Sequence, residues 1–142
     1  MMEYHSNSPK ETENIAKAFA KNLKPGDVVT LDGDLGAGKT AFTQGLAKGL
    51  GVEDYVSSPT FTIVNCYEGK YPLYHFDVYR IEDSDEMYEI GFDEYVGTDG
   101  IAVIEWAEKI KDILPEKRYE ITILKDDGMH DDFRRIIINQ VD

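Results

Sequence analysis

Cysteine is nearly absent from this chain, which has a single one, Cys66, among its 142 residues. One thiol excludes a disulfide within the chain, and no apolar run approaches the roughly 20 residues of a membrane-spanning helix. The charged, apolar and small-residue pattern of a secretory signal peptide is also missing. We therefore expect a cytoplasmic protein without a membrane partner, in which Cys66 is a small core residue.

Basic residues are also scarce. The chain has 15 lysines and arginines against 28 acids, which gives a net charge of −13, and the sole adjacent arginine pair is Arg134–Arg135. Nucleic-acid phosphates are bound by clustered basic faces, so we expect no tight binding of tRNA or DNA by this chain alone. The tetrapeptides of guanine-reading switches, Asn-Lys-x-Asp and Asp-x-x-Gly, are missing too, which favours ATP over GTP.

A phosphate-binding loop is present at residues 33–40, where GDLGAGKT matches a glycine, four residues, Gly-Lys and then Ser or Thr. Residues 27–31 before it form an apolar run typical of a buried strand, and residues 41–50 after it have helical periodicity. In this setting backbone N–H groups and the positive end of a helix converge on an anion. Lys39 is suited to binding the β- and γ-phosphates, and the Thr40 hydroxyl to binding Mg²⁺.

The same stretch also satisfies the dinucleotide fingerprint G-x-G-x-x-G/A over residues 36–41. That fingerprint needs an acid about 20 residues further on, and residues 56–59 contain none. Lys39 and Thr40 favour a nucleoside triphosphate instead.

The whole chain predicts an α/β fold, a single P-loop NTPase domain over residues 1–142. We expect a mixed sheet with parallel central strands and antiparallel hairpins, and helices on both faces. The first helix has Ser8 as its N-cap and a capping box closed by Glu11. Hairpins are predicted over residues 62–77 and 119–139, the second extending the sheet antiparallel.

Two carboxylates stand at the ends of predicted strands. Asp77 ends the run 71–77, and Glu105 ends the apolar run 101–105, which is typical of a parallel strand covered on both faces. Ligands bind at the carboxyl ends of such strands, and Mg²⁺ on a triphosphate takes only one or two carboxylates. We therefore predict that both acids serve one Mg²⁺, one directly and one through water.

Other features leave alternatives open. Trp106 is either a core residue or a platform for the nucleotide. Arg80 pairs with an acid or reaches a phosphate, the ion pair being favoured, and His75 is interpreted as a packing residue. The acidic segment 82–99 is interpreted as a solvated cover of the core, with a docking surface for a partner as the alternative.

Four motifs occur in a fixed order: GDLGAGKT at residues 33–40, SPTF at 58–61, YHFDVYR at 74–80 and IEW at 104–106. In this order and spacing they resemble the TsaE family, also called YjeE, and the resemblance spans almost the whole chain. It implies a bacterial ATPase, with ATP and Mg²⁺ as cofactors, that works in threonylcarbamoyladenosine modification of the tRNA adenosine beside the anticodon. In that family the TsaB–TsaD pair transfers the group to tRNA, and the TsaE-like protein binds that pair and hydrolyses ATP to support turnover.

The resemblance also implies roles for single residues. The catalytic residues are Asp77, Lys39 and the switch-loop residue Thr60. The metal ligands are Thr40, Glu105 and Asp77. The nucleotide-binding residues are Asp34, Leu35, Gly36, Ala37, Gly38, Lys39, Thr40, Trp106 and Arg134. Family members often place an arginine directly after the glycine of the closing hairpin, whereas here Gly128 precedes Met129, so that either Arg134 or His130 takes this role.

The implied enzyme is a P-loop ATPase that is slow alone and depends on its partners. No arginine occupies an obvious finger position beside the loop, and a missing finger leaves hydrolysis roughly 10³- to 10⁵-fold below its potential. The loop 57–61 is predicted to order against a partner. The alternative, from a different functional class, is a nucleotide-dependent regulatory binding module with little hydrolysis of its own.

Overall fold

The computed structural model describes residues 1–34, 36–57, 59, 63–126 and 128–142. Within them, seven strands form one sheet in the order β1-β7-β6-β2-β5-β4-β3. The strands are β1 (Met2–Ser6), β2 (Val28–Asp32), β3 (Val64–Tyr67), β4 (Leu73–Asp77), β5 (Ile101–Glu105), β6 (Arg118–Lys125) and β7 (Arg134–Val141).

The centre of the sheet is parallel. Strand β2 pairs parallel with both β5 and β6, and β4 pairs parallel with β5. The edges are antiparallel, because β3 pairs with β4, β7 with β6 and β1 with β7. The expectation that the second hairpin joins the sheet antiparallel was wrong for β6, which runs parallel to β2. On that side of the sheet, antiparallel pairing begins with β7 and continues to β1.

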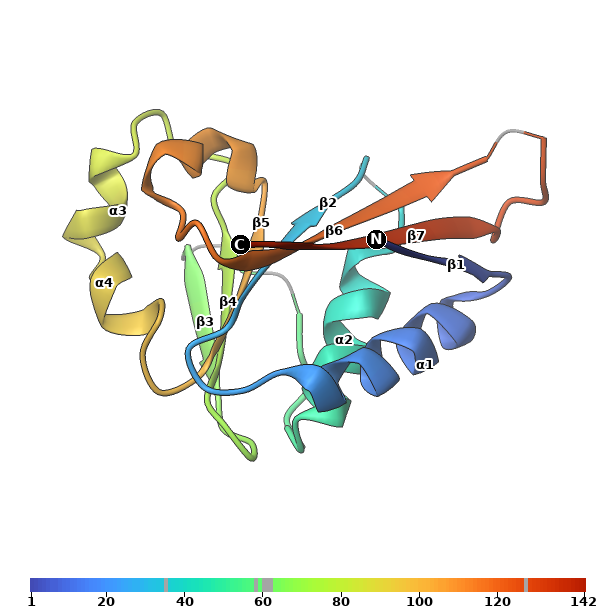
Figure 1. The fold of residues 1–142 in the computed structure, drawn as a ribbon, viewed down its shortest axis with the longest axis horizontal. Helices are drawn as coiled ribbons and strands as arrows, with labels where there is room; N and C mark the ends of the chain where they lie inside the picture. Colours follow the sequence, from blue (N-terminus) through green and yellow to red (C-terminus); the bar gives the residue numbers. More distant parts are fainter. Residues whose placement is uncertain (35, 58, 60–62, 127) are drawn as a thin grey trace.

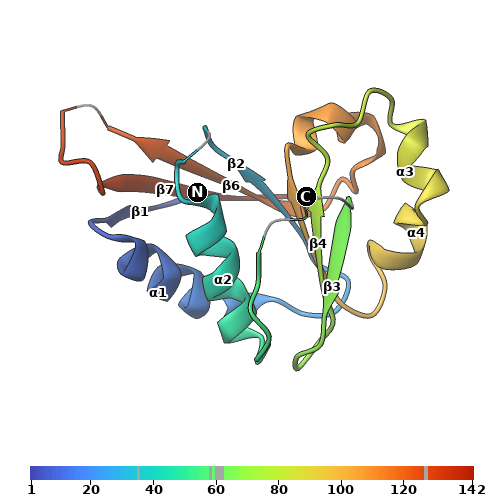
Figure 2. The same ribbon diagram turned by 180° about the vertical axis from the view of Figure 1, so that it is seen from behind.

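Helices cover both faces, as predicted. On one face lie α1 (Pro9–Phe19), the 3₁₀ turn η1 (Ala20–Asn22) and α2 (Lys39–Gly49). On the other lie α3 (Asp85–Glu89), α4 (Phe92–Tyr95) and the 3₁₀ segment η2 (Ala107–Ile113). Figures 1 and 2 show the two groups on opposite sides of the twisted sheet, with α1 and α2 packed side by side. The mixed α/β fold is thus confirmed.

Local sequence signals explain where α1 begins. The Ser8 side chain accepts a hydrogen bond from the Glu11 N–H at 3.1 Å, as an N-cap does. The Glu11 carboxylate, however, accepts from the N–H of Asn7 at 3.0 Å rather than from that of Ser8. The capping box therefore closes one residue earlier than its standard form.

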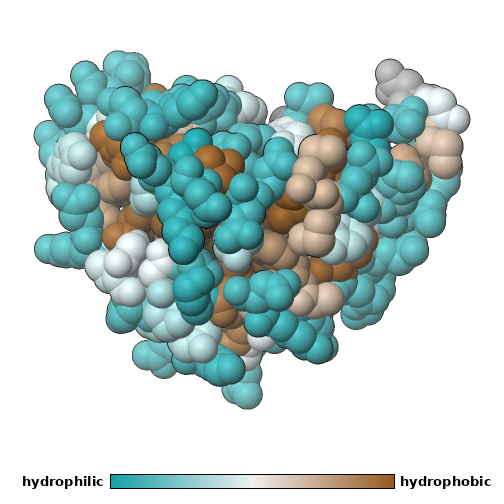
Figure 3. All heavy atoms as spheres, in the orientation of Figure 1, coloured by the Kyte–Doolittle hydropathy of each residue, from teal (hydrophilic) through white to brown (hydrophobic). Residues whose placement is uncertain are grey.

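Two apolar clusters flank the central strands. Residues of α1 and α2 pack against one face of β2 and β5, and residues of α3, α4 and η2 pack against the other. All five residues of β5 are buried, as expected for a parallel strand covered on both sides. On the outside, polar residues cover most of the face in Figure 3, and apolar residues show in the gaps between them.

The acidic segment 82–99 lies over the second cluster. Met87 of α3 and Phe92 of α4 are buried there, while most of the acids are exposed, which matches the interpretation as a solvated cover. The placement predicted for Cys66 was wrong: it is exposed on β3, an edge strand. No helix in the described part of the chain is both long and apolar enough to cross a membrane.

Candidate functional site

The connection from β2 to α2 contains the glycine-rich loop. Two of its glycines adopt positive φ angles, +79° at Gly36 and +107° at Gly38, and Gly38 is the N-cap of α2. The Ala37 N–H donates to the Asp34 carbonyl at 2.9 Å and closes a turn. Left-handed backbone at these positions suits glycine, and it gives the loop the tight curvature that brings N–H groups together.

Lys39, the first residue of α2, is 8 % exposed. Its ammonium lies over the Trp106 ring, 4.2 Å from the centroid, and forms no hydrogen bond or ion pair with any described residue. Trp106 is itself held in an unusual conformation, because it is the sole non-glycine with positive φ (62°) in the described part of the chain. Such backbone costs on the order of 1–3 kcal/mol and is concentrated at functional sites.

Glu105 ends β5 as a buried carboxylate, 4 % exposed. Its Oε2 accepts a hydrogen bond from Nε2 of His75 on the neighbouring strand β4, at 2.6 Å. His75 is 1 % exposed, and its other ring nitrogen, Nδ1, has no hydrogen-bond partner. The interpretation of His75 as a packing residue was therefore incomplete: it is the polar partner of a predicted metal ligand.

Asp77 lies beside Glu105, because the two residues are register partners in the parallel pair β4–β5. Its Oδ1 accepts a hydrogen bond from the Tyr79 N–H at 3.1 Å. Each acid thus has one oxygen engaged within the protein, and the other, Oδ2 of Asp77 and Oε1 of Glu105, bonds to no described residue. The structure places both acids at the sheet edge where the loop begins, as expected for carboxyl ends of parallel strands.

A further acid, Asp32, is the last residue of β2, the strand that leads into the glycine-rich loop, and the sequence patterns did not single it out. It lies on the opposite face of the sheet from Glu105. Burial, followed by the negative charge of Glu108 and a hydrogen bond with it, raises the pKa of Asp32 to about 6. Glu120 adds to the rise, and the Lys39 cation opposes it. Glu108 lies 76 positions further along the chain, so no local pattern signals this group.

The closing hairpin reaches the loop through Arg134. The guanidinium donates to the carbonyls of Ala37, at 2.8 Å, and of Gly36, at 3.2 Å. His130 instead lies 3.1 Å from the Asn7 side chain. Of the two candidates in the hairpin, Arg134 is therefore the one that touches the phosphate-binding loop.

Other predicted residues are placed as follows. Thr40 is exposed in the first turn of α2, and Asp34 is exposed in the loop. Arg80 is exposed and pairs with no described acid, so the favoured ion pair is not formed. Leu35 and Thr60 lie outside the described residues, and their roles stay predictions.

The site offers few protein ligands to a metal. Among described residues, no three or more His, Cys, Asp or Glu side chains gather as a metal cluster would. The predicted set has only two carboxylates and one hydroxyl. That donor count suits Mg²⁺ on a triphosphate, which keeps several waters and phosphate oxygens, better than a metal held by protein alone.

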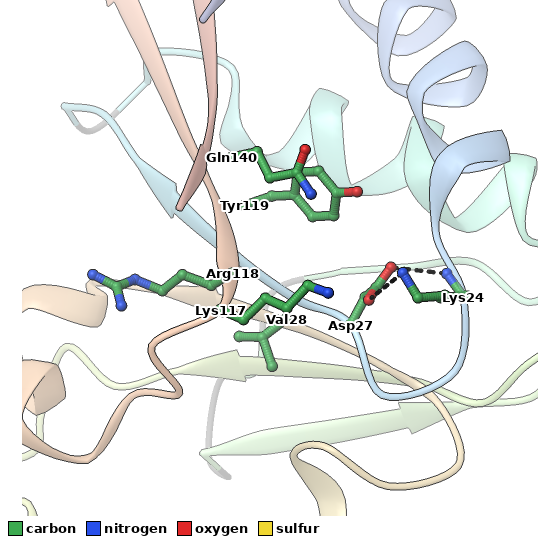
Figure 4. Close-up of a pocket in the computed structure, with 7 residues that line it drawn as sticks. All are labelled: Lys24, Asp27, Val28, Lys117, Arg118, Tyr119 and Gln140. Carbon is green, nitrogen blue, oxygen red and sulfur yellow. Dashed lines mark hydrogen bonds and ion pairs between the residues drawn. The ribbon is translucent and has the colours of Figure 1, made fainter. Parts of the chain in front are cut away.

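A hollow at the other end of the strands is a poorer candidate. It lies where β2 and β6 begin, and Figure 4 shows the side chains that line it: Lys24, Asp27, Val28, Lys117, Arg118, Tyr119 and Gln140. Lys24 is already neutralised by Asp27, 3.7 Å away, and Arg118 points away from the other polar groups towards its own partner Glu120. The loop end of the sheet therefore remains the candidate site.

Comparison with known proteins agrees with this geometry. The family model described as "Threonylcarbamoyl adenosine biosynthesis protein TsaE" matches residues 6–136. The chain belongs to the TsaE family. A curated TsaE relative, the tRNA threonylcarbamoyladenosine biosynthesis protein of Bacillus subtilis (strain 168), is 49% identical over 141 residues, covering 99% of this chain and 86% of the relative.

The TsaE relative of Treponema pallidum is 43% identical, and the match covers 83% of this chain and 86% of the relative. The TsaE relative of Haemophilus influenzae is 46% identical, and the match covers 77% of this chain and 67% of the relative. Among solved structures, Bacillus subtilis YdiB superposes with a TM-score of 0.81 at 43% identity, covering 99% of this chain and 86% of that one. The TsaE relationship and the P-loop fold predicted from the sequence are thereby confirmed.

Proposed function

We propose that this TsaE-family chain binds ATP with Mg²⁺ and hydrolyses it in the cytoplasm, to support threonylcarbamoyladenosine formation on tRNA through a TsaB–TsaD-like protein pair. The observation that supports this most is the buried Lys39 ammonium, which lies over Trp106 and forms no ion pair with any described carboxylate. Burying a cation without an anion is costly, and a phosphate at the loop would supply the missing partner. The relatives' role in threonylcarbamoyladenosine biosynthesis supports the biological context.

The chain's own groups divide the work as follows. Lys39, the Gly38 N–H and the N-terminus of α2 bind the phosphates. Thr40 and the free Oε1 of Glu105 hold Mg²⁺, which when bound neutralises charge on phosphate oxygens. The free Oδ2 of Asp77 orients the attacking water and accepts its proton.

The binding site is tested with Lys39→Ala and a matched control, Lys48→Ala. Lys48 is in the last turn of the same helix and pairs with Glu13, so its loss removes an equal charge far from the loop. We expect Lys39→Ala to weaken ATP·Mg²⁺ binding by about 100-fold, because the variant loses a charged hydrogen bond to a buried phosphate. Calorimetry measures this, and circular dichroism verifies folding. A folded Lys39→Ala variant with normal ATP affinity would contradict the assignment of the nucleotide site to this loop.

Nucleotide choice is tested by competition. We expect ATP to displace a fluorescent ADP analogue at lower concentration than GTP does, because both guanine-reading tetrapeptides are missing. GTP binding equal to or tighter than ATP binding would contradict the choice of ATP.

Phosphate release separates an ATPase from a regulatory module. The isolated chain should hydrolyse slowly, and a TsaB–TsaD-like pair should speed release or hold nucleotide more firmly. Arg80→Ala, with and without the pair, shows whether this exposed arginine supplies the missing charge in cis. ATP-dependent docking without phosphate release would favour the regulatory module, and fast turnover that partners leave unchanged would refute the partner role.

A further inference from the structure

The Arg134 guanidinium, at the start of β7, donates its hydrogen bonds to backbone carbonyls. Its Nε and Nη2 donate to Ala37 and Gly36 in the loop, and its Nη1 donates to Asp131, at 2.5 Å, and Phe133, at 2.8 Å. A guanidinium has five N–H groups, so four are used. Although the chain has 28 acids, Arg134 forms no ion pair with a described carboxylate.

These bonds orient two successive peptide units of the loop. The unit between Gly36 and Ala37 is held at both ends, because Arg134 binds its C=O and the Asp34 carbonyl binds its N–H. The unit between Ala37 and Gly38 is held by its C=O alone. In a trans peptide the N–H points opposite to the C=O, so the Gly38 N–H points away from the guanidinium. That N–H bonds to no described residue and is free for an anion.

We propose that Arg134 is a positioning residue that holds the phosphate-binding loop in its binding conformation before nucleotide arrives. It acts on the carbonyl side of the loop, so that the Gly38 N–H and the first turn of α2 stay aimed at the phosphates. Preorganising donors in this way lowers the ordering cost of binding. The link to nucleotide rests on the proposed function, but the orientation of the loop does not.

A second cation provides a matched control. The Lys125 ammonium lies 3.6 Å from where a Cβ on Gly36 would stand, yet it bonds to no described residue. Replacing Lys125 thus removes one positive charge near the loop, as replacing Arg134 does, but breaks no hydrogen bond to a loop carbonyl. Arg134→Lys is the complementary variant, because it keeps the charge but replaces a planar fork by a single nitrogen.

The first experiment measures amide exchange by NMR in the nucleotide-free protein. In Arg134→Ala and in Arg134→Lys, we expect the Ala37 amide to exchange on the order of tenfold faster, because the turn it closes loses its anchor. In Lys125→Ala its exchange should stay at the wild-type rate. If Arg134→Ala does not fold, Arg134→Lys carries the test. Wild-type exchange in Arg134→Lys, or an equal rise in Lys125→Ala, would overturn the proposal, since charge alone would then suffice.

The second experiment compares ADP and ATP affinities. A loop-positioning residue should affect both alike, so Arg134→Ala should weaken each by a similar factor, on the order of tenfold, at low and high salt. The weaker effect of Lys125→Ala should fade as salt screens it. A loss confined to ATP would place the guanidinium on the γ-phosphate and overturn the positioning role. If the wild type binds neither nucleotide, the proposed function fails, and the exchange result still decides whether Arg134 orients the loop.

Discussion

At the scale of single residues, the site is built from buried charges with few partners. Among described residues, Glu105 has one side-chain partner, His75, and the Lys39 ammonium lies over an aromatic ring without a hydrogen bond or ion pair. A buried carboxylate is tolerated where a hydrogen bond compensates its lost hydration. The His75 bond also occupies Oε2, so that Glu105 has only Oε1 to offer a metal.

Replacing His75 by leucine should therefore destabilise the protein by about 3 kcal/mol, because it leaves the Glu105 charge buried and unpaired. Urea unfolding at constant pH measures the effect. The control is a double-mutant cycle: in a Glu105→Leu background, the same substitution should cost less than about 1 kcal/mol, since no charge is left behind. Equal costs in both backgrounds would mean that His75 contributes packing alone.

Asp32 should make stability depend on pH. Its pKa is raised to about 6 from an ordinary value of 3.8, so between these values the native state keeps a proton that the unfolded state has lost. The stability that this proton confers is complete below about pH 4 and is lost as the pH rises through about 6. Asp32→Asn, neutral throughout, should thus be more stable than wild type at pH 8 and equal to it near pH 4.

Urea midpoints of both proteins at the two pH values measure this difference. Glu53→Gln, which changes an exposed acid, is the control and should show no pH-dependent gain. An Asp32→Asn variant that is no more stable than wild type at pH 8 would mean that the Asp32 charge does not destabilise the folded state.

At the scale of elements, α2 depends on a very close approach to α1. A Cβ on Gly45 would stand 2.2 Å from the Glu13 carbonyl oxygen and 2.7 Å from the Ala16 Cβ. Gly49, one turn later, would meet Ala20 in the same way. Because α2 begins with Lys39 and Thr40, this contact also sets the position of the two residues proposed to bind phosphate and Mg²⁺.

Gly45→Ala should destabilise the protein despite the better helix propensity of alanine. Alanine gains about 1 kcal/mol within a helix, but forcing two backbones apart costs more, so we expect a net loss of about 1–2 kcal/mol. Chemical unfolding measures it, with Gly128→Ala as control, because a Cβ there meets its nearest neighbour at 3.4 Å. The control should change stability by less than about 0.5 kcal/mol. A stabilised Gly45→Ala would show that the helices separate freely.

At the scale of the whole molecule, the net charge of −13 limits what the protein holds by itself. The cations around the loop, Lys39, Lys125 and Arg134, are a local exception. They suit a small anion rather than the long phosphate backbone of a tRNA, which needs an extended basic face.

The isolated chain should therefore bind tRNA more weakly than about 10⁻⁴ M at roughly 0.15 M salt, the weak end of non-specific binding. Fluorescence anisotropy with labelled tRNA measures this, and a basic tRNA-binding protein under the same conditions verifies the probe. Micromolar binding by the chain alone would contradict the view that partner proteins hold the tRNA.

Sequence by itself determined the parts of this protein that local patterns encode. The strand–loop–helix from β2 to α2, the cap at Ser8 and the buried strand ending at Glu105 are each signalled within a short window, since backbone conformation and burial follow from neighbouring residues. The ordered motifs also sufficed to predict the family, and the pattern of apolar strands and helices sufficed to predict the α/β fold.

The tertiary structure alone decided which distant groups meet. His75 and Glu105 are 30 residues apart, and the alternation within each strand indicates a face but not the neighbouring strand. Arg134 binds carbonyls 97 and 98 residues away, and a backbone acceptor has no side-chain signature to read. The parallel pairing of β6 with β2 follows from how the chain crosses the sheet, which residue periodicity does not encode.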